Sequence, residues 1–340
     1  MRKKILSSLQ YIIFLGAGLL LVWWQLHGMT EEKKEEFIYA FTHAKYILVL
    51  PVVLMNLASH LVRSMRWKLL MEPLGFNPKL KNVFAVTMVG YLANSAVPRL
   101  GEVLKCTLLA RYEKLKVDKL IGTIIIERTF DLICYILFIV ITVLIQINVI
   151  GSYVKGKLTD YAKSTAMPLW AELLILFAGL FIIVYIFMKI FSKYPENKVL
   201  IKIRAFAIGI GTGIATIKNL QQRKKFIAYT LFIWAMYLLQ IYIGFRAMES
   251  TADLGIKAAC AVLTLSTLAM IVTPGGIGSF PFFIMETLGM YGIALSQGQA
   301  FGWLIWGIST GLIIVAGVIS LVLLPYINKK KNEIYTANTA

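Results

Sequence analysis

Apolar runs alternate with short polar stretches along almost the whole chain of 340 residues. A helix rises about 1.5 Å per residue, so about 20 apolar residues cross the roughly 30 Å hydrocarbon core of a bilayer. Six runs are long enough and predict full membrane spans: 5–26, 46–67, 119–148, 170–190, 226–247 and 300–324. The pattern therefore predicts an all-α polytopic membrane protein.

Two further apolar stretches, 82–111 and 257–294, are interrupted near their centres by Pro and Gly. Most of their halves are too short to cross a bilayer alone. Irregular backbone at membrane depth is tolerated only where protein or water covers it. We therefore predict that each stretch forms a re-entrant helical hairpin or a broken helix.

The order span, broken stretch, span occurs at 46–148 and again at 226–324. The first copy is expected to begin outside the cell and the second inside, so the two repeats would have inverted topology. Interrupted segments at corresponding positions of two halves point to a transport site near the bilayer midplane. Chance alignment of two hydrophobic patterns is the alternative, because few residues are identical between the halves.

Composition supports a membrane protein, because 59% of the residues are hydrophobic and only 15% are charged, whereas soluble domains have about 25% charged residues. The formal net charge is +18. Most of this charge flanks the apolar runs, where Lys and Arg mark the cytoplasmic face. The stretch 27–45 carries more Glu than Lys and is expected outside. We therefore expect a protein of the cytoplasmic membrane with both termini in the cytoplasm, and no nucleic-acid partner.

Residues 1–325 are predicted to form one transmembrane domain, followed by a basic cytoplasmic tail at 326–340. The first apolar run is too long for a signal-peptide core and lacks a cleavage site, so it is expected to be retained as a span. Residues 198–225 alternate basic and apolar side chains, which is typical of a helix lying in the inner membrane interface. The three His and three Cys show no metal-ligand spacing, so we expect no metal and no cofactor.

Charged residues inside a membrane span cost about 2.5 to 3.5 kcal/mol each, so their presence suggests function. In the first break, Pro98 removes a backbone donor and Gly101 permits an unusual turn, which leaves Arg99 and Glu102 facing a polar environment. Asn94 lies about one turn earlier and adds a neutral donor and acceptor. The guanidinium fork suits a phosphate. A hairpin tip held by a salt bridge is the structural alternative.

The span 119–148 carries Glu127, Arg128 and Asp131. Glu127 and Asp131 are one helical turn apart and can flank a common partner. Paired carboxylates need a cation, so Arg128, Arg99 or a basic residue of the second span is an expected neighbour. A purely structural ion-pair network is an equally open interpretation.

Two other sets of residues are weaker candidates. Arg63 and Arg66 share a helix face at the inner end of 46–67 and could receive a lipid headgroup, although ordinary positive-inside placement also explains them. The second break contains Pro274, Gly275, Gly276 and Gly278. The helix that restarts there could aim backbone N–H groups at an anion, and glycine used only for tight packing is the competing interpretation.

Three motifs, "NSAVPRLGEVLKCTLL", "GTIIIERTFDL" and "PGGIG", resemble in this order those of the lysylphosphatidylglycerol synthase transmembrane domain family, also described as flippase-like integral membrane proteins. The resemblance covers roughly residues 5–325. Bifunctional members join this domain to a cytosolic aminoacyl-lipid synthase, and the polar stretches here are too short for such a domain. The resemblance therefore implies lipid translocation rather than aminoacylation.

The resemblance also implies which residues are functional. They are Pro98, Arg99, Gly101, Glu102, Glu127, Arg128, Asp131, Pro274, Gly275, Gly276 and Gly278. The chain departs from the family at Pro281, where many members have an acidic residue.

The leading hypothesis is a flippase that moves a phospholipid, an aminoacylated lipid or a polyprenyl-phosphate-type lipid through a basic groove between inverted repeats. Its expected partners are membrane lipids with a phosphate headgroup, and the sequence leaves homo-oligomerisation open. An intramembrane transferase acting on a lipid-linked sugar or headgroup is the alternative. A third hypothesis is an accessory subunit without a substrate of its own.

Overall fold

In the computed structural model, the described residues are 15–25, 27–97, 99–146 and 220–329. The chain divides into two compact units. Unit 1 contains Met1–Arg128 and Ile217–Ala340, and unit 2 contains Thr129–Thr216. The described part of unit 2 is one continuous stretch, residues 129–146, that completes a helix begun in unit 1. Unit 1 carries all the contacts described below.

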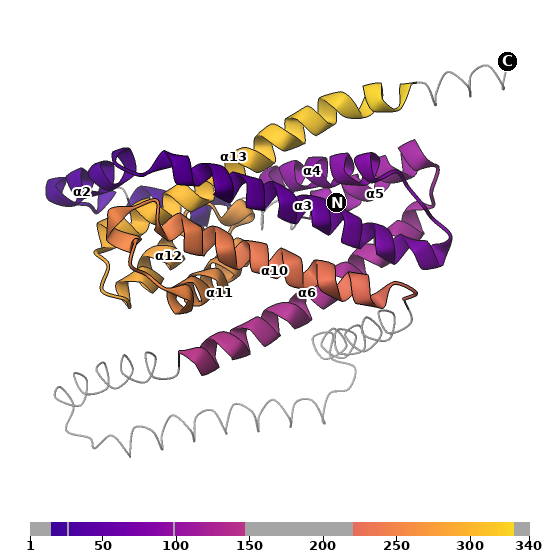
Figure 1. Ribbon diagram of the computed structural model, residues 1–340. Helices are drawn as coiled ribbons and strands as arrows, with labels where there is room; N and C mark the ends of the chain where they lie inside the picture. Colours follow the sequence, from indigo (N-terminus) through magenta and orange to yellow (C-terminus); the bar gives the residue numbers. More distant parts are fainter. Residues whose placement is uncertain (1–14, 26, 98, 147–219, 330–340) are drawn as a thin grey trace, which may run out of the picture. The chain divides into compact units, whose positions relative to one another are not determined.

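Regular structure in the described residues is entirely helical, as the sequence predicts. The α-helices are Leu15–Gln25, α2 (Glu31–Thr42), α3 (Val49–Met71), α4 (Leu80–Ala96), α5 (Leu100–Glu113), α6 (Val117–Ile145), α10 (Arg223–Phe245), α11 (Ile256–Val272), α12 (Ser279–Gly289) and α13 (Leu295–Ile327) (Figure 1). The short 3-10 turns are η1 (Tyr46–Leu48), η2 (Glu72–Leu74), η3 (Glu249–Thr251) and η4 (Pro274–Gly276).

Four helical segments in the described part of the chain are long and apolar enough to cross a membrane. They are Tyr46–Leu74, Val117–Ile145, Arg223–Phe245 and Leu295–Ile327. Each coincides with a span predicted from the sequence. The predicted span 5–26 is described only over the shorter helix Leu15–Gln25, the span 170–190 lies outside the described residues, and so does most of the predicted interfacial helix 198–225.

Helices α3 and α10 pack against each other in antiparallel directions, and both are 23 residues long. Just before α3, the Lys45 backbone N–H donates to the Ala247 carbonyl, just after α10, at 2.7 Å. At the other end of the pair, Gln222 Nε2 donates to the Glu72 carboxylate at 2.9 and 2.8 Å. The start of each helix therefore lies beside the end of the other.

The two predicted helix breaks are present, and the same local rule produces both. Helices α4 and α11 are each 17 residues long, and each ends just before a residue that precedes proline. Proline excludes the helical conformation from the preceding residue. Val97 accordingly has φ −137° and ψ 116°, and Thr273 has φ −127° and ψ 152°.

After each break the chain turns back, so α4 packs along α5 and α11 packs along α12. At the open end of the first hairpin, Glu113 Oε1 accepts hydrogen bonds from the Lys79 backbone N–H at 3.1 Å and from Asn82 Nδ2 at 2.6 Å. At the open end of the second hairpin, Ser296 donates to the Glu36 carboxylate of α2.

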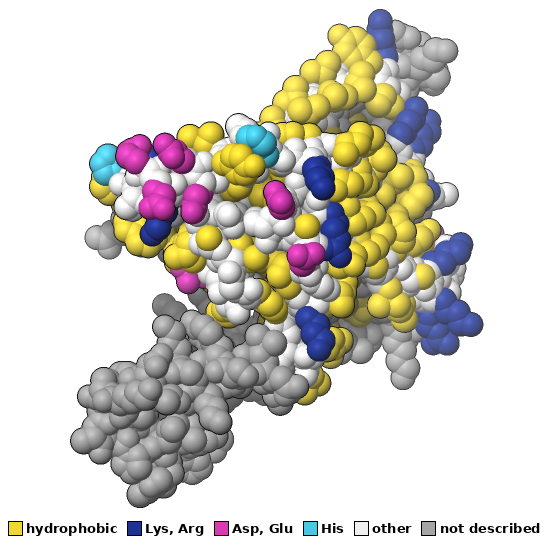
Figure 2. Space-filling view, turned by 60° about the vertical axis from the view of Figure 1, so that its left-hand side comes forward, with side chains coloured by type: hydrophobic (Ala, Val, Ile, Leu, Met, Phe, Trp, Pro, Cys, Tyr) yellow, Lys and Arg dark blue, Asp and Glu magenta, His cyan; other side chains and the backbone are white. Residues whose placement is uncertain are grey.

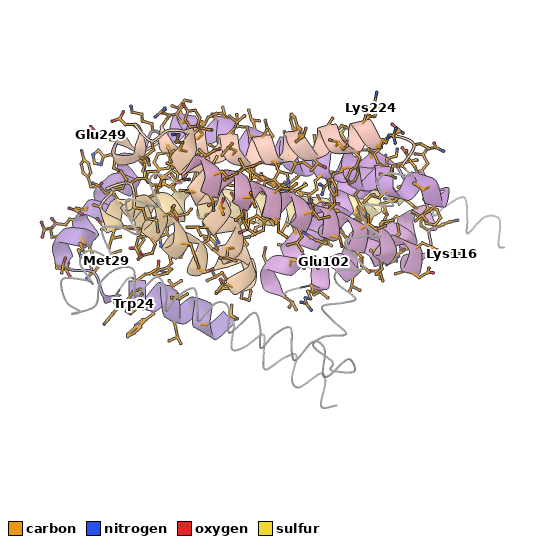
Figure 3. All side chains as sticks on the ribbon, turned by 90° about the horizontal axis from the view of Figure 1, so that it is seen from below. Trp24, Met29, Glu102, Lys116, Lys224 and Glu249 are labelled. Carbon is orange, nitrogen blue, oxygen red and sulfur yellow. The ribbon has the colours of Figure 1, made fainter. Side chains whose placement is uncertain are left out.

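These two open ends lie at opposite ends of unit 1. Figure 3 places Met29 and Glu249 at one end, Lys116 and Lys224 at the other, and Glu102 between them. The tips meet in between, because η4 of the second hairpin packs against α4 of the first, with Gly275 beside Ser95.

The stretch 27–45 forms a helix that the hydrophobic pattern did not predict. Helix α2 is capped at its N-terminus by Thr30, whose Oγ1 accepts from the Lys33 backbone N–H at 3.5 Å, and Glu31 and Glu32 occupy its first turn. A Thr cap and acidic residues in the first turn both favour a helix start. The helix forms although none of its residues is buried.

The surface of unit 1 is largely hydrophobic. Side chains such as Leu20, Leu50, Leu231 and Tyr326 are more than half exposed. In Figure 2 most acidic side chains gather at the upper left and many Lys and Arg side chains lie along the right-hand edge, with much hydrophobic surface and a few charges of both signs between them. Such a hydrophobic surface between polar ends is typical of a protein that lies in a bilayer.

Candidate functional site

A buried cluster of charges surrounds Glu127 of α6. Glu127 Oε1 lies 3.2 Å from Arg63 Nε and 3.6 Å from Arg66 Nη2, and Oε2 lies 3.2 Å from Lys105 Nζ. The side chains of Glu127, Arg66 and Lys105 are 1%, 0% and 4% exposed, and that of Arg63 is 14% exposed. One carboxylate therefore pairs with cations from both α3 and α5. We call these four residues the Glu127 cluster.

Aromatic and hydroxyl side chains hold the arginines of the Glu127 cluster in place. Arg63 Nη1 donates to the Tyr237 hydroxyl at 3.1 Å, and Arg66 Nη1 donates to Thr230 Oγ1 at 3.3 Å. The Arg66 guanidinium also lies over the Phe226 ring, 5.6 Å from its centre. Buried charges are tolerated where each is paired and hydrogen-bonded, and α10 supplies these additional partners.

Lys105 is held by α3. Its Nζ lies 4.3 Å from the centre of the Trp67 ring, a cation–π contact. The Trp67 indole N–H in turn donates to Thr123 Oγ1 of α6 at 2.9 Å. The cluster thus ties α3, α5 and α6 together.

A second charged group lies nearer the surface, beside the first break. Arg128 Nη2 lies 3.0 Å from Glu102 Oε1, and the two side chains are 41% and 27% exposed. Asn94 Nδ2 also donates to Glu102 Oε1 at 3.4 Å, and Asn94 Oδ1 accepts from the Gly101 backbone N–H at 2.8 Å. Asn94 therefore bridges the two arms of the hairpin. We call Asn94, Arg99, Glu102 and Arg128 the tip group.

Backbone conformation and close packing make two positions of the first break unusual. Arg99 is exposed at the hairpin tip with φ 68°, a left-handed conformation that is rare for a residue with a side chain. Gly101 faces Gly90 so closely that a Cβ at position 101 would overlap the Gly90 carbonyl and the Asn94 side chain. Pro98 lies outside the described residues.

The second break is neutral and closed by hydrogen bonds. Gln25 Nε2 donates to the Gly278 carbonyl at 2.9 Å, and the Trp306 indole N–H donates to the Gly275 carbonyl at 2.9 Å. Within the break, Thr273 and Ser279 hydroxyls lie 2.7 Å apart. Gly275, Gly276 and Gly278 all have positive φ, which glycine adopts without strain.

Half of the residues that the sequence singled out contact one another, in two groups. Two of these pairings are informative. Glu127 has the expected basic neighbours from the second span, namely Arg63 and Arg66. Glu102 pairs with Arg128 of α6, so the salt bridge at the hairpin tip joins two different helices. Arg66 is fully buried, so a headgroup could reach it only if the surrounding helices moved apart.

Other candidates lie elsewhere. Asp131 belongs to unit 2. Pro274 and the glycines of the second break contact the Leu15–Gln25 helix, α4 and α13. Cys106 and Cys260 are buried, in line with a packing role. The described residues contain no group of three or more His, Cys, Asp or Glu placed to hold a metal.

Sequence reasoning missed Lys105 and Tyr237. Lys105 follows Glu102 by three residues within an apolar stretch, so helical spacing and the cost of a buried lysine were available signals. Tyr237 carried no such signal, because tyrosine is common in membrane spans and its contact with Arg63 joins helices 174 residues apart in the sequence.

Residues 9–317 match the family described as the lysylphosphatidylglycerol synthase TM region. A UPF0104 membrane protein of Methanocaldococcus jannaschii is 22% identical over 311 residues, which cover 86% of this chain and 89% of that protein. Another from the same organism is 26% identical over 247 residues, covering 71% and 99%. One from Methanothermobacter thermautotrophicus is 19% identical over 286 residues, covering 77% and 80%.

No solved structure matches the chain. The family match covers most of the sequence, so the chain belongs to the family of the lysylphosphatidylglycerol synthase TM region. Family and apolar helices together make it a membrane protein related to lipids, with several helices able to span the bilayer.

Proposed function

We propose that this member of the lysylphosphatidylglycerol synthase TM-region family is a flippase that moves a phosphate-bearing lipid across the cytoplasmic membrane. The observation that carries the proposal is the meeting of the two helix breaks. Their hairpins open to opposite ends of unit 1, yet η4 touches α4 midway between them. Paired breaks of this kind favour a site that can be reached from either side.

In this proposal the tip group receives the phosphate. Arg99 is exposed and the Arg128 side chain is 41% exposed, so both guanidinium groups are within reach of a ligand. Arginine binds phosphate through two parallel charge-assisted hydrogen bonds. The acyl or prenyl chains would remain against the hydrophobic surface of the helices.

Glu102 acts as the counterion of the empty site. Its carboxylate neutralises Arg128 at 3.0 Å when no lipid is bound. An arriving phosphate competes with Glu102 for Arg128, and the returning carboxylate then helps to release the lipid. The Glu127 cluster is the rigid base of the site, because its charges are paired and nearly all buried.

The distribution of basic and acidic residues sets the proposed orientation in the membrane. The basic residues near Lys116 and Lys224 lie at the end of unit 1 opposite the acidic helix α2. The positive-inside rule places the basic end in the cytoplasm and α2 outside. The first hairpin then enters from the cytoplasm and the second from outside.

The test is transport of acyl-labelled phosphatidylglycerol in vesicles that contain the purified protein. Arg99→Ala is expected to weaken lipid binding about ten- to hundredfold, because a charge-assisted hydrogen bond contributes about 1.5 to 3 kcal/mol. Glu102→Gln is expected to lower the maximal rate instead, since release slows. Arg111→Ala is the matched control, because Arg111 is an exposed arginine of the same hairpin. Unchanged transport in both test variants would remove the tip group as the site.

A further inference from the structure

A track of buried neutral polar side chains leads through unit 1 to the Glu127 cluster. At one end, Asn56 Nδ2 of α3 donates to Gln240 Oε1 of α10 at 3.1 Å and to Ser309 Oγ of α13 at 3.2 Å. One helical turn further along α3, His60 packs against Tyr91 of α4, with 5.0 Å between ring centres. We call Asn56, His60, Tyr91 and Gln240 the polar track.

The polar track is continuous with both charged groups. The Arg63 guanidinium of the Glu127 cluster lies over the Tyr91 ring, 5.9 Å from its centre. Tyr91 also precedes Asn94 of the tip group by three residues on α4, and side chains at that spacing share a helix face. A lipid phosphate at the tip group would therefore place its headgroup toward the track.

Each member of the track has at least one polar atom without a partner in the described structure. These atoms are Asn56 Oδ1, both ring nitrogens of His60, the Tyr91 hydroxyl and Gln240 Nε2. Asn56, His60 and Gln240 are only 6%, 8% and 7% exposed. A buried unpaired polar group is costly, and several in one place are an arrangement that a bound polar ligand would satisfy.

The chemistry of the unpaired atoms limits the class of ligand that could bind there. The amide nitrogen of Gln240 donates and the amide oxygen of Asn56 accepts, while an imidazole and a phenol can each donate and accept. Alcohol hydroxyls offer the same combination. An ammonium group only donates, and the track offers it no carboxylate. Both oxygens of Glu127 already bind cations, and the unpaired carboxylate oxygen Glu102 Oε2 belongs to the tip group and not to the track.

We propose that the polar track recognises an uncharged, hydroxyl-bearing headgroup, such as a glycerol, polyol or sugar, attached to the phosphate that the tip group binds. This inference rests on the proposed function and names its substrate class. Because the unpaired atoms are buried, the headgroup reaches them when the α4–α5 hairpin parts from α3.

Two matched lipids test the inference. Phosphatidylglycerol and phosphatidylethanol both carry one phosphodiester charge, and only the first has headgroup hydroxyls. Binding of short-chain forms to the purified full chain is measured by native mass spectrometry, and transport of acyl-labelled forms is measured in vesicles. The wild-type protein is expected to prefer phosphatidylglycerol by about two- to tenfold for each hydrogen bond gained.

Tyr91→Phe and His60→Phe keep the ring packing and remove only the unpaired polar atoms. Both variants are expected to bring the ratio of phosphatidylglycerol affinity to phosphatidylethanol affinity toward one. Binding of phosphatidylethanol is expected to stay unchanged. Neither is expected to lower thermal stability, since the atoms removed have no partner to lose. Ser64→Ala is the control, because its buried hydroxyl on α3 already donates to the His60 carbonyl at 3.0 Å.

Equal binding of the two lipids by the wild-type protein would overturn the inference. So would a preference that survives Tyr91→Phe and His60→Phe, or one that Ser64→Ala abolishes equally. If His60→Phe fails to fold, Tyr91→Phe decides alone. A binding preference without transport of either lipid would refute the flippase proposal and leave the headgroup recognition standing.

Discussion

The two hairpins of unit 1 are alike in plan and opposite in chemistry. Each begins with a 17-residue helix that stops before an X–Pro step. The α4–α5 hairpin carries Arg99, Glu102 and Lys105 near its tip, whereas the α11–α12 hairpin has no charged residue from Ala258 to Met285. The first tip is exposed at Val97 and Arg99, and the second is buried at Thr273 and Ser279.

This difference suggests a division of roles between two copies of one plan. In the proposed function the charged tip binds a headgroup, and Glu102 neutralises Arg128 when no headgroup is bound. A neutral tip made of glycines and hydroxyls can pack closely against neighbouring backbone. The proposed flippase would use the charged tip to bind lipid and the neutral tip to pack against its neighbours.

The largest expected effect is that of Glu127→Ala, on stability. Removing the carboxylate leaves cations from α3 and α5 together in a buried site, and breaking such a group costs about 3 to 5 kcal/mol. Thermal unfolding in detergent measures the loss. Glu286→Ala is the control, because Glu286 is an exposed glutamate on the neutral hairpin. Equal stability of the two variants would show that the charged hairpin is not anchored by this cluster.

Gly278→Ala is expected to have an intermediate effect on the neutral hairpin. Gly278 has φ 73°, and a Cβ there would lie 2.5 Å from the Gly18 carbonyl oxygen. Strain of this kind costs about 1 to 3 kcal/mol. Gly307→Ala provides the contrast, since a Cβ at that position meets nothing within 4 Å and alanine favours a helix. A stable Gly278→Ala protein with full transport would contradict the packing role of this tip.

Glu102→Gln is expected to have the smallest effect on stability. Its ion pair with Arg128 is partly exposed, and such pairs contribute less than about 1 kcal/mol. The same sample is nevertheless expected to transport lipid slowly. Thermal unfolding and lipid transport, measured on the same sample, therefore separate a binding role of Glu102 from a structural one. A large loss of stability would show that Glu102 stabilises the hairpin structure.

The sequence was sufficient to predict the two helix breaks, because their determinants are local. Val97 precedes Pro98 and Thr273 precedes Pro274, so the helix ends could be placed from neighbouring residues alone. Four of the predicted spans coincide with helices of sufficient length and hydropathy. Helix α2 was missed because hydrophobic periodicity was the criterion, and its signal lay in the Thr30 cap and the acidic first turn.

The pairings within the site could not be read from the sequence. Several arginines could pair with Glu102 in a fold consistent with the sequence, and hydropathy does not show which of them does. Lys105 meets Glu127 only because α5 returns along α4 and packs near α6, which no local pattern encodes. Gln25 reaches Gly278 across 253 positions of sequence. Contacts of this kind depend on which helix faces meet.

The hydrogen bonds that close the two tips span very different distances along the sequence. This difference affects the order in which they can form as the chain leaves the ribosome. Asn94 and Gly101 are seven residues apart, so the first tip can close as soon as its own hairpin has been synthesised. The second tip needs Gln25 from the first described helix, Leu15–Gln25, and Trp306 from α13. The first tip can therefore close early in membrane insertion, whereas the second tip lacks its Trp306 hydrogen bond until α13 has been synthesised.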